Sequence, residues 1–158
     1  MNKRNYVAPA LFAATLLVSL ILYTVAPPEL ERRLLFFPDT AGGERHAERH
    51  YVPRRSAQVD QIQIFIEELQ LGPVQLGSVP FIPDTAELRS LVLDEEGVLY
   101  IDFTPNIMFD EQDSERNFSD LEELLTENLH HNFPSLESSV VLVGGQVPDA
   151  PSFGEISR

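Results

Sequence analysis

Hydrophobic residues are unevenly distributed along this chain, and the longest apolar run lies near its N-terminus. Residues 7–25 read VAPALFAATLLVSLILYTV and contain no Asp, Glu, Lys or Arg. Helical residues rise about 1.5 Å each, so this run approaches the roughly 30 Å thickness of the hydrocarbon core of a bilayer. Lys3 and Arg4 precede it, and the positive-inside bias then keeps the N-terminus in the cytoplasm. The pattern predicts an uncleaved, single-pass signal anchor in the cytoplasmic membrane, with everything after Pro28 extracytoplasmic or periplasmic.

Two other interpretations of the run are weaker. A secretory signal peptide has a shorter apolar region, of about 7–15 residues, followed by a small-residue cleavage site. The A-x-A-like candidate here is residues 24–26 (TVA), and Pro27 would follow the cut. A core helix of a soluble domain would carry a polar face, which this run lacks. We therefore expect a cytoplasmic stub and transmembrane anchor over residues 1–28, an extracytoplasmic domain over 29–147, and a flexible tail over 148–158.

Beyond the anchor, short apolar segments separated by Pro, Gly and charged residues indicate strands. Strands are expected at residues 31–37, 50–52, 87–93, 98–103 and 139–143, with a hairpin turn at 94–97. In the last strand, residues 140–143 (VVLV) are expected to be buried on both faces.

Two stretches show the three- and four-residue spacing of amphipathic helices. The first is expected to begin after Ser56 as its N-cap and to end at Gly72-Pro73. The second begins with a capping-box pattern, Ser119 and Glu122, and ends at Pro134. Their predicted core faces are Val59, Ile62, Phe65, Ile66 and Leu69 in the first, and Leu121, Leu124, Leu125, Leu129 and Phe133 in the second. Each helix can cover a sheet with one apolar face, so we expect a compact two-layer α+β domain with a small mixed sheet.

The charge of the chain limits its partners. It has 25 acidic and 11 basic residues, a net charge of −14, and no cysteine. Such a chain would be repelled by nucleic acid and by anionic lipid headgroups, so we expect no nucleic-acid partner. Without cysteine it has no disulfide, no lipoprotein anchor and no thiolate chemistry, and its stability must come from packing.

Histidines near the start of the domain are the first candidates for chemistry. His46 and His50 are four residues apart and close to Glu44 and Glu48, so a helix would align them as metal ligands. Glycines upstream and a proline downstream favour a loop and a strand instead. We therefore expect both histidines to be exposed polar residues.

The remaining candidates are less specific. His130 and His131 are adjacent near a helix end, where they do not face each other but can meet the negative end of the helix. The acidic stretch 110–117 (DEQDSERN) lacks the glycine and ligand spacing of an EF-hand, so a solvated loop is expected. No nucleophile elbow or phosphate-binding glycine loop is present, although a glycosidase-type carboxylate pair stays open because its spacing is spatial. We expect no enzyme, and no catalytic, cofactor-binding or metal-binding residues.

Several stretches in a fixed order resemble the GerMN domain family, which is named after a spore germination and sporulation protein. They are residues 34–39 (LLFFPD), 65–73 (FIEELQLGP), 80–85 (PFIPDT), 98–104 (VLYIDFT), 125–134 (LTENLHHNFP) and 140–146 (VVLVGGQ). The resemblance covers nearly all of residues 31–147. Two features depart from the family pattern: Glu127-Asn128-Leu129 stands where the family usually has Asn-Thr-Leu, and residues 110–117 are unusually acidic.

The resemblance implies a fold similar to ring-building motifs. It further implies a non-enzymatic, membrane-tethered interaction domain of the bacterial cell envelope, in sporulation or in cell-wall assembly. Its partners would be other envelope proteins or further copies of the chain. An alternative stays open: a domain that binds or hydrolyses cell-wall glycan, or binds a small ligand, in a pocket lined by Tyr100, Phe103 and nearby acidic residues.

Overall fold

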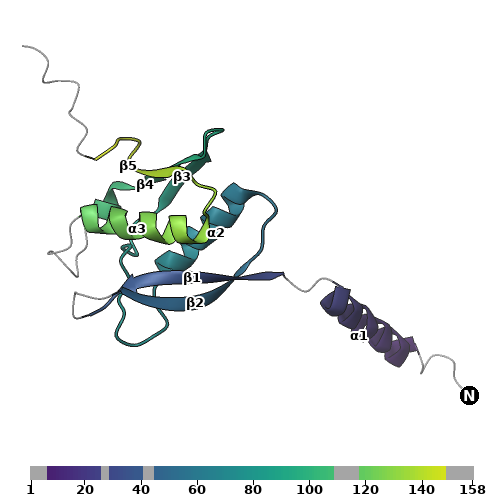
Figure 1. Ribbon diagram of the computed structural model, residues 1–158. Helices are drawn as coiled ribbons and strands as arrows, with labels where there is room; N and C mark the ends of the chain where they lie inside the picture. The colour runs from purple at the N-terminus through teal and green to yellow at the C-terminus, as the bar shows by residue number, and fades with distance from the viewer. Residues whose placement is uncertain (1–6, 26–28, 41–44, 109–117, 149–158) are drawn as a thin grey trace, which may run out of the picture.

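The computed structural model describes residues 7–25, 29–40, 45–108 and 118–148 (Figure 1). The expected acidic loop at 110–117 and all of the expected tail beyond residue 148 lie outside these residues. The elements are α1 (Val7–Val25), β1 (Leu30–Pro38), β2 (Arg45–Pro53), α2 (Gln58–Leu71), β3 (Leu88–Leu93), β4 (Val98–Phe103), a 3-10 turn η2 (Pro105–Met108), α3 (Phe118–Asn132) and β5 (Ser138–Val143). The predicted α+β class is confirmed.

The N-terminal apolar run forms α1, a helix of 19 residues. Large apolar side chains along it are exposed, among them Leu11, Phe12, Leu16 and Leu17. Within the described part of the chain, no helix meets the combined length and hydropathy of a membrane span.

The strands form two sheets rather than the single mixed sheet that we expected. β1 and β2 are an antiparallel hairpin, while β3, β4 and β5 form a second sheet in that order, antiparallel at β3–β4 and parallel at β4–β5. Figure 1 shows α3 between the β1–β2 hairpin and the second sheet, and it contacts both β1 and β5. The sheets stay separate because α3, not another strand, lies along the free edge of β1.

Two asparagines of α3 close that edge of β1. The Asn128 Oδ1 accepts a hydrogen bond from the Phe36 N–H (2.8 Å), and its Nδ2 donates to the Phe36 carbonyl (3.0 Å). One helical turn later, the Asn132 amide makes the same pair of bonds to the Leu34 N–H (3.1 Å) and carbonyl (2.7 Å). Each side-chain amide thus replaces one residue of a neighbouring strand, which satisfies backbone groups that must be paired when buried.

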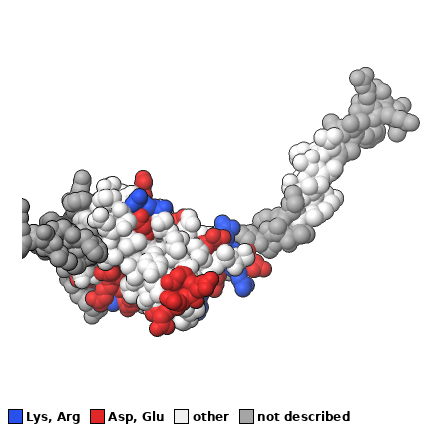
Figure 2. Space-filling view, turned by 90° about the horizontal axis from the view of Figure 1, so that it is seen from above, with Lys and Arg blue, Asp and Glu red and all other residues white. Residues whose placement is uncertain are grey.

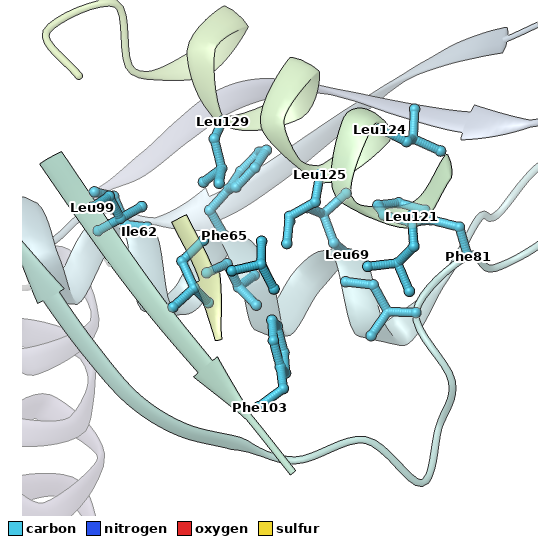
Figure 3. Close-up of a cluster of buried hydrophobic side chains, with 14 of the residues drawn as sticks. Ile62, Phe65, Leu69, Phe81, Leu99, Phe103, Leu121, Leu124, Leu125 and Leu129 are labelled. Atoms are coloured by element: carbon cyan, nitrogen blue, oxygen red, sulfur yellow. The ribbon is translucent and has the colours of Figure 1, made fainter. Parts of the chain in front are cut away.

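The core lies between the hairpin, the two helices and the second sheet, and it contains the predicted helix faces except Val59, which is only partly buried (Figure 3). α2 contributes Ile62, Phe65, Ile66 and Leu69, whereas α3 contributes Leu121, Leu124, Leu125 and Leu129. Burying one such side chain stabilises the fold by about 1.5–3 kcal/mol. The amphipathic spacing therefore identified the core-facing side of both helices.

Element boundaries correct four of the predictions. The N-cap of α2 is Ala57 rather than Ser56, and it makes no side-chain capping bond. Ser119 lies inside α3, which begins at Phe118, so it is not the N-cap. β2 extends over nine residues instead of three, because its polar half pairs with β1. In β5 only Val141 is buried, so residues 140–143 are not buried on both faces as expected.

Candidate interaction surface

The hydrogen-bond register of the hairpin leaves the outer edge of β2 open. Leu34 and Phe36 direct their peptide groups toward α3, and they stand opposite Arg49 and Ala47. In an antiparallel ladder, two opposed residues either both bond across the pair or both point away from it. The peptide groups of Ala47, Arg49 and, two residues on, Tyr51 therefore point away from β1. No hydrogen bond within the described residues occupies these groups.

A groove of about 330 Å³ follows this edge. Its wall includes Glu48 and His50, which face the interior, and also Arg49 and Tyr51, which face outward. Because residues of both orientations line it, the groove lies along the edge of β2 rather than over one face of the hairpin. Val74 and Gln75 form the remaining wall.

Val74, which lines the groove, belongs to a stretch from the end of α2 onward that carries several exposed apolar side chains. Val74 is 82% exposed and Leu76 is completely exposed, while Leu71, the last residue of α2, is 80% exposed. Tyr51 adds an aromatic ring that is 65% exposed. Adjacent exposed apolar groups of this size are typical of surfaces that bind other molecules.

A buried polar cluster holds this segment against β2. The Glu48 carboxylate accepts hydrogen bonds from the N–H groups of Val74 (2.9 Å) and Gln75 (3.2 Å). His50 lies between two carboxylates, with its Nε2 3.3 Å from Glu48 and its Nδ1 2.7 Å from Glu68. Burial raises the pKa of Glu48, but the bonds from Val74, His50 and Gln75 outweigh burial and set the pKa below its ordinary value. Glu48 therefore stays ionised and fixes one wall of the groove.

The structure separates the two histidines considered as metal ligands. His50 is buried in β2, so the expectation of an exposed residue is wrong for it, because both ring nitrogens have carboxylate partners. His46 is partly exposed, with its Nε2 4.0 Å from the Asp39 carboxylate. Glu44 lies outside the described residues. Among the residues that are described, no group of three or more His, Cys, Asp or Glu side chains could hold a metal ion.

The remaining predicted candidates lie apart from the groove. His130 and His131 occupy the last turn of α3, and the His131 ring meets the Phe36 ring edge-on with centroids 4.9 Å apart. Tyr100 is partly exposed on β4, but Phe103 is completely buried in the core. Phe103 therefore cannot line the aromatic ligand pocket that the alternative function requires.

A second hollow, of about 280 Å³, lies where β2 leads into α2. Arg33, Arg54 and Arg55 line it, although the chain as a whole is strongly acidic. The Arg33 guanidinium lies over the Phe133 ring, 4.4 Å from its centroid, and pairs with Glu31 at 3.0 Å. Figure 2 shows acidic side chains gathered in the middle of one face, with basic ones near the point where the chain enters the domain.

The sequence pattern did not predict the open β2 edge, the groove or this concentration of arginine. One signal was present. Six of the eleven basic residues, but only three of the 25 acidic ones, fall between residues 32 and 55. That local excess marks residues 32–55 as a basic stretch of an acidic protein.

Comparison with known proteins gives a consistent family and fold. The family model "Germane: Sporulation and spore germination" matches residues 34–149. The first GerMN domain of the sporulation protein GerM from Bacillus subtilis superposes with a TM-score of 0.54 at 15% identity, over 74% of this chain and 85% of that one. The tandem GerMN domains of the same protein give a TM-score of 0.52 at 14% identity, over 75% of this chain and 41% of that one. No curated protein matches the sequence.

Proposed function

Because this chain belongs to the Germane family of sporulation and spore germination domains, we propose that it is a membrane-tethered protein-interaction domain of the bacterial cell envelope. The tether is the apolar segment 7–25, and residues 29–147 form the extracytoplasmic interaction domain. The chain acts by binding other envelope proteins rather than by catalysis.

One observation carries the interaction role: the outer edge of β2 is open beside a groove to whose wall Val74 and Tyr51 contribute exposed apolar surface. An unpaired strand edge offers backbone donors and acceptors in a regular row, which is a ready template for a second chain. Val74, Leu76 and Tyr51 add apolar area that water covers in the isolated chain. Backbone pairing and apolar burial together are the usual basis of stable protein recognition by a sheet edge.

The sequence supports the tether. Residues 7–25 contain no charged side chain, and Lys3 and Arg4 precede them. The exposed apolar side chains along α1, such as Leu16, would be costly in water and favourable in hydrocarbon.

The interaction role is tested by crosslinking the full-length protein in its native cells, followed by mass spectrometry of the captured proteins. We expect the same few envelope proteins to be recovered in repeated experiments. Recovery of only abundant membrane proteins, in proportion to their abundance, would refute the interaction role.

The tether is tested separately by alkaline carbonate extraction of membranes and by protease accessibility. The wild-type chain should stay in the membrane pellet with its domain accessible only from outside the cytoplasm. Leu16→Arg places a charge at the centre of the segment, which costs about 2.5–3.5 kcal/mol, and should release part of the protein. Leu16→Phe is the matched control and should remain in the pellet. A wild-type chain found in the soluble fraction would refute the tether.

A further inference from the structure

We propose that the β2 edge binds an extended, acidic segment of a partner protein, which adds to the β1–β2 hairpin as a third strand. This inference rests on the proposed interaction function and specifies its site and the chemistry of the partner. It is argued from the register of the hairpin, the charges on it and the position of the groove.

The register supplies the backbone component of binding. Ala47, Arg49 and Tyr51 direct their N–H and C=O groups outward at alternate positions, as a strand does toward its neighbour. The strand does not need to rearrange, since its opposite edge is already paired with β1 over nine residues. An added strand would extend an existing ladder.

The charges select an acidic partner. Arg49 is exposed in the middle of the edge, and it makes no hydrogen bond or ion pair with any described residue. Arg54 and Arg55 are exposed directly beyond the end of β2, where Arg54 pairs with Glu29 at 3.5 Å. By contrast, Arg45 at the other end is already paired with Glu123 and Glu127 of α3. Among the described residues, the arginines of this edge without an ion pair are therefore Arg49 in its middle and Arg55 beyond its C-terminal end.

The same charges disfavour a second copy of this chain as the occupant. Two β2 strands that pair edge to edge around Arg49 would place like charges directly opposite each other. An acidic segment from another protein meets the arginines with opposite charge and gains charge-assisted contacts.

The groove predicts the side-chain pattern of the partner. Side chains of an added strand alternate between the two faces of the hairpin. On the interior side they would meet Val74 beside Glu48 and His50, and on the outer side they would meet Arg49 and Tyr51. We therefore infer a segment in which apolar residues alternate with Asp or Glu.

The test uses the full-length protein in native cells, with a photo-crosslinking amino acid at position 51 or, as a control, at position 92. Val92 is also exposed on a strand but belongs to the second sheet. Ala47→Pro, combined with the probe at 51, removes an outward N–H without removing a bond to β1. Arg49→Glu reverses the central charge, whereas Arg49→Lys retains it. Thermal unfolding of each variant verifies that the hairpin is intact.

The expected result is a crosslink from position 51 to an alternating apolar and acidic segment of an envelope protein. Ala47→Pro and Arg49→Glu should each lower its yield at least about tenfold, which corresponds to the loss of one good hydrogen bond or contact. Arg49→Lys should retain most of the crosslinking yield. If Ala47→Pro prevents folding, the crosslinking yields of Arg49→Glu and Arg49→Lys still test whether the β2 edge binds an acidic segment.

Other outcomes overturn the proposal in distinguishable ways. Crosslinks from position 92 alone would leave the interaction function standing and remove the β2 edge as its site. Crosslinks from position 51 to a second copy of this chain, to lipid, or to a segment without acidic residues would refute the acidic-strand mode. Absence of specific crosslinks from either position would overturn both this inference and the proposed function.

Discussion

Replacing Asn128 by alanine should destabilise the domain more than any other single change at a polar residue of α3. Asn128 is completely buried, and the substitution removes both hydrogen bonds to the Phe36 peptide group. Leaving a buried donor or acceptor unsatisfied costs about 1–3 kcal/mol. The substitution leaves two such groups, the Phe36 N–H and carbonyl, and water at the edge of β1 can satisfy them in part. We therefore expect the free energy of unfolding to fall by about 2–4 kcal/mol. Since domains are stable by about 5–15 kcal/mol, the variant should still fold.

Urea unfolding of the full chain, followed by circular dichroism, measures this loss. Asn106→Ala is the matched control, because the Asn106 side chain donates a single bond to the Thr85 carbonyl (3.1 Å) at an exposed site. The control should lose less than about 1 kcal/mol. Hydrogen exchange should show a faster-exchanging Phe36 amide in Asn128→Ala only. Equal stability of the two variants, or an unchanged Phe36 amide, would show that α3 does not close the β1 edge through this side chain.

Three further predictions test other contacts. Glu48 has a lowered pKa in the folded state, so its stabilising effect is complete above the unfolded-state pKa and is lost as pH falls through the folded-state value. The melting temperature of Glu48→Gln should therefore fall less steeply than that of wild type below about pH 4.5, whereas the exposed control Glu67→Gln should follow wild type. Gly97→Ala should lower the free energy of unfolding in urea by about 1 kcal/mol, because Gly97 has φ +87° and an added Cβ would lie 3.4 Å from the Glu137 backbone nitrogen. Equal stability of the variant and wild type would argue against this turn geometry. Asp102→Asn should lower the free energy of unfolding by about 1–3 kcal/mol in the same assay, since Asp102 pairs with Arg89 at 3.0 Å and accepts a hydrogen bond from the Gly145 N–H at 2.8 Å. An unchanged stability would mean that these contacts do not persist in solution.

Hydrophobic periodicity predicted the elements well where burial alone defines them. The faces of α2 and α3 follow from apolar residues three and four apart, and β4 follows from a short apolar run after a turn. β2 was predicted too short because its interior-facing positions include Glu48 and His50, which break the expected alternation. Those two residues are buried only because they bond to each other and to distant backbone groups. A one-dimensional pattern does not contain that information.

The division into two sheets and the open edge have a similar cause. Both depend on Asn128, which stands where the family pattern usually has threonine and which the sequence alone marked only as a departure. Its partner, Phe36, is 92 residues away in the chain. Which edge of the hairpin is closed follows from this contact and the matching one between Asn132 and Leu34, and the register with β1 then sets which peptide groups of β2 point outward. Local propensity therefore predicted the class of the fold but not the open edge of β2.

The two edges of the hairpin differ in a way that bears on function. Closing the β1 edge required two asparagines one helical turn apart, each bonded to an N–H and a carbonyl. On β2 the equivalent groups are exposed, so water satisfies them and the isolated chain loses little stability by leaving them open. The strand itself is already ordered, because Val52 is completely buried in the interior and Glu48 is bonded to residues 74 and 75. A partner segment would therefore bear almost all of the ordering entropy of binding, and a rigid segment should bind more tightly than a flexible one of the same sequence.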